Sequence, residues 1–94
     1  MVLVLINYTK PYEQVAAVVA EHRAFLGKHY AAGTLVVSGP RATKTGGIVL
    51  ARGKSAAEVA EIFKQDPYAL HGVATHEVIE FDAVKHAPGF EPFL

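Results

Sequence analysis

The chain has 94 residues, of which 51% are apolar and 19% are charged, and its nine basic residues balance nine acidic ones. A chain of this length forms one hydrophobic core and has no room for a second domain. Without net positive charge it does not attract nucleic acid or an anionic membrane, so we expect neither as a partner. Cysteine is absent, which excludes disulfides and a thiolate nucleophile and favours a cytoplasmic protein. The apolar run of residues 1–6 is too short for a signal-peptide core or a membrane span.

The first two predicted elements are a strand and a long helix. Residues 2–8 form a continuous β-favouring run, which predicts a strand covered on both faces. Pro11 and Glu13 suit a first helical turn, and we expect the helix to continue to about Ala32 and to stop at Gly33. The side chains that share one face of this helix are Val15, Val18, Val19, His22, Phe25, Leu26 and His29.

A hairpin follows the helix. Residues 34–38 predict a strand and residues 46–52 predict its antiparallel partner across a short polar loop. At the end of the first of these strands, Gly39, Pro40 and Arg41 could arrange backbone amides and a guanidinium around an anionic group of a ligand. The alternative is a plain hairpin loop with solvated charges.

A second helix and a last strand complete the order. Residues 55–58, Ser-Ala-Ala-Glu, form a capping box that predicts a helix start. The apolar face of this helix ends in Asp66, directly before Pro67, which disfavours further helix and begins a short turn. Residues 75–84 predict the last strand, and residues 85–94 predict an irregular tail.

The order β-α-β-β-α-β predicts a ferredoxin-like α+β fold, an antiparallel sheet with both helices on one face. Because the first strand is apolar on both sides, we expect a second copy of the sheet to cover the other face in a homodimer. Phe90 and Phe93 make a free tail unfavourable, so we expect the tail to pack on the partner or over the mouth of a pocket.

Two polar residues interrupt the apolar helix faces and are candidates for chemistry. His22 can give or take a proton near neutral pH, although it could also be a core histidine bonded to a backbone group. Asp66 must find a donor in an apolar layer, although it could also simply cap the turn at Pro67. Because both helices cover the same face of the sheet, contact between His22 and Asp66 is geometrically plausible.

Other catalytic arrangements have less support. Ser38 has no nucleophile-elbow context, which argues against a hydrolase triad. The histidines have no zinc-site spacing, so we expect no metal. His76 and His86 are interpreted as solvated residues.

Six short segments together resemble the YCII-related family of the dimeric α/β-barrel superfamily, over nearly the whole chain. They are His22–Leu26, Gly33–Leu35, Ser38–Pro40, Gly47, Asp66–Tyr68 and Gly72–Val73. The resemblance implies a single YCII-like domain over residues 1–94, paired sheet to sheet, with a His-Asp dyad at His22 and Asp66. The family resembles a chlorohydroxyhydroquinone dehydrochlorinase, which eliminates chloride from an aromatic ring without a metal or organic cofactor. Where this chain has Tyr68 the family often has Phe, so the role of that hydroxyl stays open.

Our leading hypothesis is a cofactor-independent lyase or isomerase acting on a small cyclic or aromatic polar ligand. His22 is the candidate general acid or base, and Asp66 its orienting partner. The candidate substrate-binding residues are Ser38, Gly39, Pro40, Arg41 and Tyr68. The alternative is a non-catalytic ligand-binding or accessory domain, in which the dyad is a polar network that fixes packing.

Overall fold

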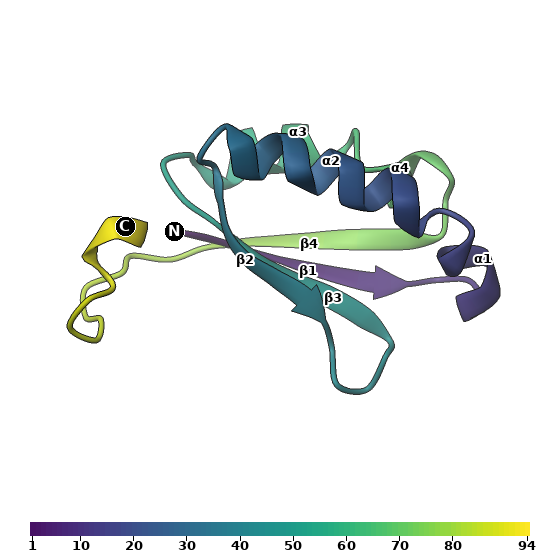
Figure 1. Cartoon of the computed structure of the whole chain (residues 1–94), viewed down its shortest axis with the longest axis horizontal. Helices are drawn as coiled ribbons and strands as arrows, with labels where there is room; N and C mark the ends of the chain where they lie inside the picture. Colours follow the sequence, from purple (N-terminus) through teal and green to yellow (C-terminus); the bar gives the residue numbers. More distant parts are fainter.

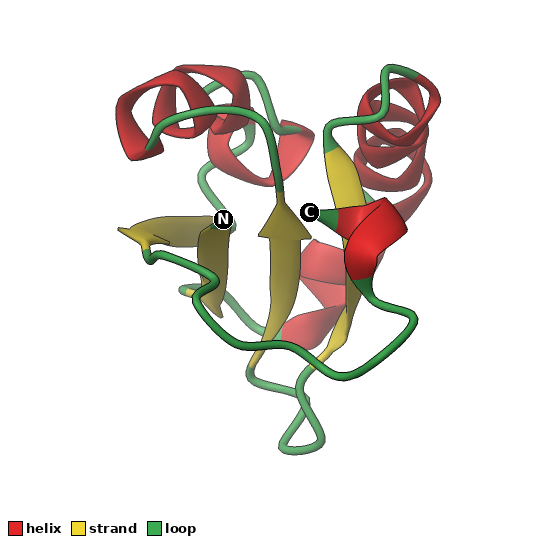
Figure 2. Cartoon of the chain, turned by 90° about the vertical axis from the view of Figure 1, so that its left-hand side faces the viewer, coloured by secondary structure: helices red, strands yellow, loops and turns green.

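The computed structural model describes residues 1–94 and contains a four-stranded antiparallel sheet with helices on one face (Figures 1 and 2). The strand order β2-β3-β1-β4 is that of the predicted ferredoxin-like α+β fold, which is thereby confirmed. The elements are β1 (Val2–Tyr8), α1 (Tyr12–Ala16), α2 (Val19–Ala31), β2 (Leu35–Pro40), β3 (Gly46–Ala51), α3 (Ala56–Phe63), α4 (Pro67–Leu70), β4 (Ala74–Glu80) and the 3₁₀ turn η1 (Glu91–Phe93).

Alternation along the central strand β1 divides the sheet into two faces. Val2, Val4 and Ile6 are buried beneath the helices, whereas Leu3 and Leu5 point to the opposite face. Strand pairing extends that second face across β2, β3 and β4, and no helix covers it (Figure 1). Its apolar residues are Leu3, Leu5, Val37, Ile48, Leu50 and Ile79.

The hydrophobic core lies between the covered face and the helices. Val15 and Val18 contribute from the N-terminal helical region, and Val59 and Phe63 from α3. Burying a side chain of this kind stabilises the fold by roughly 1.5–3 kcal/mol. At the start of β3 the backbone of Gly46 comes so close to β1 that a Cβ there would lie 1.8 Å from the carbonyl oxygen of Ile6.

The prediction of one long helix was wrong, because the chain turns between α1 and α2. The Val18 N–H donates to the carbonyl of Val15 at 2.9 Å, an i→i−3 bond that tightens the turn, and Val18 has φ −109°. Val15, just before the turn, and Val18, within it, are both buried, so tertiary packing holds the bend. The bend brings Tyr12 of α1 to 6.3 Å from Tyr8, measured between ring centroids.

Apart from the end of the last strand, the other boundaries follow the prediction closely. The capping box is present, since Ser55 Oγ accepts from Glu58 N–H at 3.2 Å and the Glu58 carboxylate accepts from Ser55 N–H at 2.9 Å. Strand β4 ends at Glu80, earlier than expected, because its only neighbour is β1 and Glu80 already pairs with Val2. Beyond that pair the N–H of Phe81 donates to the Met1 carbonyl at 3.0 Å.

The C-terminal tail is irregular apart from η1 and lies at the end of the sheet away from α1 (Figure 1). Arg52 donates from its guanidinium to the carbonyl of Pro92, and the Phe90 and Phe93 rings lie 5.5 Å apart. The pocket described below is at the α1 end, so this tail does not cover its own chain's pocket. None of the helices has the length and apolar character needed to span a bilayer.

Candidate active site

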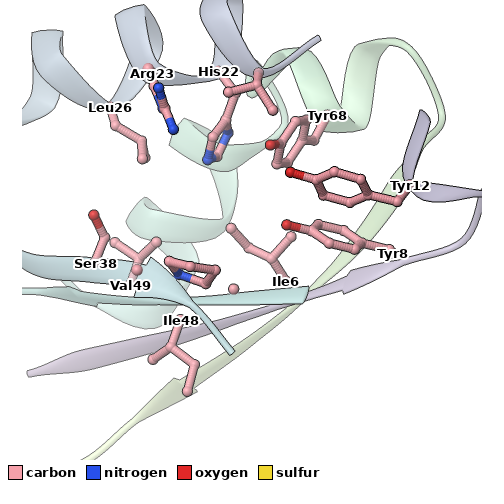
Figure 3. Close-up of a pocket in the computed structure, with 14 residues that line it drawn as sticks. Ile6, Tyr8, Tyr12, His22, Arg23, Leu26, Ser38, Ile48, Val49 and Tyr68 are labelled. Atoms are coloured by element: carbon pink, nitrogen blue, oxygen red, sulfur yellow. The ribbon is translucent and has the colours of Figure 1, made fainter. Parts of the chain in front are cut away.

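A pocket of about 310 Å³ opens between α2 and the sheet at the α1 end of the molecule (Figure 3). Its walls combine aliphatic side chains with a histidine, an arginine and three tyrosines. The lining residues are Ile6, Tyr8, Tyr12, Val19, His22, Arg23, Leu26, Ser38, Gly39, Pro40, Gly47, Ile48, Val49 and Tyr68.

His22 and Asp66 are in direct contact in the buried layer beside this pocket. His22, on α2, is 8% exposed, and Asp66, at the start of α4, is 0% exposed. His22 Nδ1 lies 2.7 Å from Asp66 Oδ1, as expected from the two apolar helix faces. The same carboxylate oxygen accepts from Tyr68 N–H at 3.0 Å, so Asp66 also caps α4. The two roles weighed as alternatives for Asp66 therefore occur together.

A second histidine completes the environment of Asp66. His76 Nε2, on β4, lies 2.8 Å from Asp66 Oδ2. Its side chain is only 10% exposed, so the interpretation of His76 as a solvated residue was wrong. The signal was present in the sequence, because Ala74, His76 and Val78 alternate along β4 on the side that faces the helices.

These contacts determine the charge of Asp66. Burial alone would raise its pKa, but hydrogen bonds from His22, His76 and the Tyr68 N–H outweigh that effect and hold the pKa at about 2. The group is therefore a carboxylate at neutral pH and acts only as an acceptor. His22 Nδ1–H and His76 Nε2–H must both be donors, which leaves His22 Nε2 free for proton transfer to a ligand.

Three tyrosines form the wall beside His22. The Tyr68 ring stacks on the imidazole, and Tyr8 meets Tyr68 edge-on at 6.0 Å between centroids. In Figure 3 the hydroxyls of Tyr8, Tyr12 and Tyr68 all point toward the pocket. Burial, the neighbouring Tyr8 and the charge of Asp66 raise the pKa of Tyr68 to about 12, and burial also raises the pKa of Tyr8. Both phenols therefore remain hydrogen-bond donors at neutral pH.

Tyr8 and Tyr12 are pocket residues that were not predicted from the sequence. Side chains alternate along β1, so Tyr8 lies on the same face as Val2 and Val4, the face covered by the helices. This alternation could have identified it from the sequence. Tyr12 could be placed only once the bend between α1 and α2 was known.

Most of the candidate substrate-binding residues line the pocket, but one of them does not. Ser38, Gly39 and Pro40 line the pocket at the end of β2, and Ser38 Oγ lies 2.6 Å from the hydroxyl of Tyr30. Arg41 does not line it. Its backbone N–H donates to the Gly46 carbonyl at 2.9 Å, which closes the hairpin loop.

Arg23, which the sequence analysis did not single out, is the guanidinium in the pocket wall. No cluster of three or more His, Asp or Glu side chains is arranged to hold a metal ion.

Comparison with known proteins identifies both a family and a similar fold. The family model described as the YCII-related domain matches residues 1–82. The structure is similar to that of 5-chloro-2-hydroxyhydroquinone dehydrochlorinase (TftG) from Burkholderia phenoliruptrix AC1100, in complex with 2,5-dihydroxybenzoquinone. The TM-score is 0.69 at 21% identity, over 87% of this chain and 94% of that chain. At this identity the likeness shows a shared fold. No protein of curated function matches the sequence.

Proposed function

We propose, since the chain belongs to the YCII-related domain family, that it is a cofactor-independent enzyme transferring a proton to or from a small ring-shaped polar molecule. His22 Nε2 is the general acid or base, and Asp66 orients the imidazole and balances its positive charge. The observation that carries this proposal is the 2.7 Å contact between His22, which lines the pocket, and the buried Asp66.

The pocket favours a single oxygen-bearing ring as the ligand. Its volume of about 310 Å³ is at the lower end of the range for small-molecule sites. Aliphatic walls suit the faces of a ring, and the phenols of Tyr8 and Tyr68 suit its hydroxyl or carbonyl oxygens. The structurally similar dehydrochlorinase was crystallised with 2,5-dihydroxybenzoquinone, a ligand of this kind.

The reaction type that we propose is elimination, as in that dehydrochlorinase. Loss of hydrogen chloride from a chlorinated hydroxyhydroquinone removes two hydroxyl protons, adds one proton to the chlorine-bearing carbon, and releases the other proton. Chloride leaves with the electron pair of its bond to carbon, so the product is a hydroxyquinone and no oxidant is consumed. One imidazole that alternately gives and takes protons is suited to these steps.

The test uses 5-chloro-2-hydroxyhydroquinone as probe and measures chloride release together with quinone absorbance. We expect turnover by the wild type and a loss of at least about 100-fold in the His22→Asn variant. His71→Asn is the matched control, because His71 also contacts a carboxylate, that of Glu21 at 3.2 Å, but is exposed outside the pocket. Equal rates for the His22→Asn variant and the wild type would reject the proposal.

A non-catalytic ligand-binding domain is the second candidate. It is favoured by the completeness of the network, in which Asp66 caps α4, accepts from two histidines, and no buried side-chain polar atom lacks a partner. Binding of 2,5-dihydroxybenzoquinone without any turnover would support it. In that case His22→Asn should cost stability and leave affinity nearly intact.

The proposed assembly is a cytoplasmic homodimer joined through the open face of the sheet. Val37 is 57% and Ile48 41% exposed in the single chain, so the face offers apolar surface for a second copy.

A further inference from the structure

Asp66 is shared by two imidazoles that belong to different cavities. Its Oδ1 lies 2.7 Å from His22 and its Oδ2 lies 2.8 Å from His76. His22 lines the pocket already described, whereas His76 lines a second cavity of about 340 Å³ between α3, α4 and β4. The carboxylate therefore connects a ring at the candidate active site with a ring, 10% exposed, that lines the second cavity.

The two rings compete for one negative charge. A single imidazolium beside the Asp66 carboxylate makes the group of three side chains neutral, whereas two imidazoliums leave a net positive charge in a largely buried layer. An uncompensated charge in such surroundings is costly. Protonation of one ring therefore disfavours protonation of the other, although the two rings are not hydrogen-bonded to each other.

We propose that His76 is a proton-exchange residue that keeps the charge of the site constant while His22 reacts. This inference rests on the proposed function of His22. When His22 Nε2 takes a proton from the ligand, an imidazolium at His76 releases its Nδ1 proton to water in the second cavity. When His22 gives its proton back, His76 takes one up. No proton crosses the carboxylate, because each ring keeps the N–H that it donates to Asp66.

Other charged groups near the two rings do not link them. Beside His22 are Tyr68, which is stacked on it, and Arg23, which shares its pocket. Beside His76 in the second cavity is Lys64, whose ammonium is 2.6 Å from the carboxylate of Glu61. Among the ionisable groups, Asp66 alone is hydrogen-bonded to both histidines.

Two variants of His76 separate its hydrogen bond from its proton. His76→Gln keeps an N–H donor for Asp66 but cannot carry an extra proton, and His76→Leu removes both. With 5-chloro-2-hydroxyhydroquinone we expect the His76→Gln variant to show a KM within about twofold of wild type and a kcat at least about tenfold lower. Free imidazole in the buffer should restore much of that kcat. Lys64→Gln, in the same cavity, is the matched control and should leave kcat unchanged.

A second measurement decides the inference without turnover. In ¹⁵N NMR spectra of the histidine rings at pH 7, His76→Gln gives the whole Asp66 charge to His22, so the His22 nitrogens should move toward imidazolium values. His22→Asn should move the His76 nitrogens in the same sense, and the signals of His86, on the tail, should stay in place. The inference would be overturned if the signals of His22 in the His76→Gln variant and of His76 in the His22→Asn variant were both unchanged. It would also be overturned by a His76→Gln variant that turns over at the wild-type rate. Absence of turnover in the wild type would defeat the proposed function alone.

Discussion

The Tyr68 ring lies parallel to the His22 imidazole, with 3.8 Å between the ring centroids and 5° between the ring planes. The stack fixes the plane of the imidazole, and the bond to Asp66 fixes its rotation within that plane. His22 Nε2 is therefore held in one direction before any ligand arrives, which would reduce the cost of orienting it in the proton transfer that we propose.

Tyr68→Phe should separate the stack from the hydroxyl. We expect the free energy of unfolding to change by less than about 1 kcal/mol, because the aromatic ring and its contacts remain. Affinity for 2,5-dihydroxybenzoquinone should fall about 3- to 10-fold, because one hydrogen bond to the ring oxygens is lost. Calorimetric titration measures this loss. Tyr68→Ala should instead destabilise the fold by about 3–5 kcal/mol, because the ring is almost fully buried. Unchanged affinity in the Phe variant would mean that the hydroxyl does not bind the ligand.

Acid should destabilise the protein through Asp66. Its pKa is about 2 in the folded chain, against an ordinary value of 3.8. Because the folded value is the lower one, the stabilisation is fully present above pH 3.8 and is lost as the pH falls through about 2. The loss amounts to about 2 kcal/mol of unfolding free energy. Urea titrations at a series of pH values measure it.

The Asp66→Asn variant is the comparison for that measurement. It should be less stable than wild type at neutral pH, and the difference should shrink as the pH approaches about 2. Glu61→Gln, at an exposed position, should retain the acid dependence of the wild type. A difference between wild type and Asp66→Asn that is constant with pH would contradict the assignment of an ionised Asp66.

Dimerisation should depend on the open face of the sheet. Ile79→Lys places a charge on this face at the edge strand β4, where Ile79 pairs with Leu3 and is 39% exposed in the single chain. We expect sedimentation to show a dimer for the wild type and a substantial monomer fraction for the variant at micromolar concentration. Leu70→Lys is the control, because Leu70 is 64% exposed on α4, on the helix side, and should leave the dimer intact. A stable wild-type monomer under these conditions would reject the dimer.

Removal of residues 88–94 tests the tail. Because the tail lies at the opposite end of the chain from its own pocket, we expect the truncated protein to form a weaker dimer and to bind 2,5-dihydroxybenzoquinone as the full chain does. Arg52→Ala, which removes the contact with the Pro92 carbonyl, should have a smaller effect in the same direction. Dimer affinity that is unaffected by the truncation would show that the tail has no part in assembly.

Local signals predicted most of the fold. The capping box at Ser55, the helix stop at Gly33 and the apolar run of β1 each depend on nearby residues, and each is where the sequence places it. The bend after α1 could not be predicted in the same way. Its residues, Ala17 and Val18, are compatible with a continuous helix, and the bend is held by burial against distant parts of the chain.

The candidate site shows the same division. His22 and Asp66 could be paired from the sequence because each interrupts an apolar face and both faces meet the same layer. The alternation of Ala74, His76 and Val78 places His76 with two apolar residues on one face of β4, but that this face is the covered one follows from the pairing of β4 with β1. Arg41 was placed near the ligand by its position in the loop, whereas the pocket lining ends at Pro40 and does not include it.

The close approach of Gly46 to the Ile6 carbonyl limits which residues can replace glycine at position 46. Any side chain at this position would push β3 away from β1 and displace Gly47 and Ile48, which line the pocket. A substitution at position 46 should therefore reshape the pocket without touching a bound ligand, so natural drift or directed evolution is closed at this position. Gly27, whose Cβ would meet nothing within 4 Å, is a position where such drift remains open.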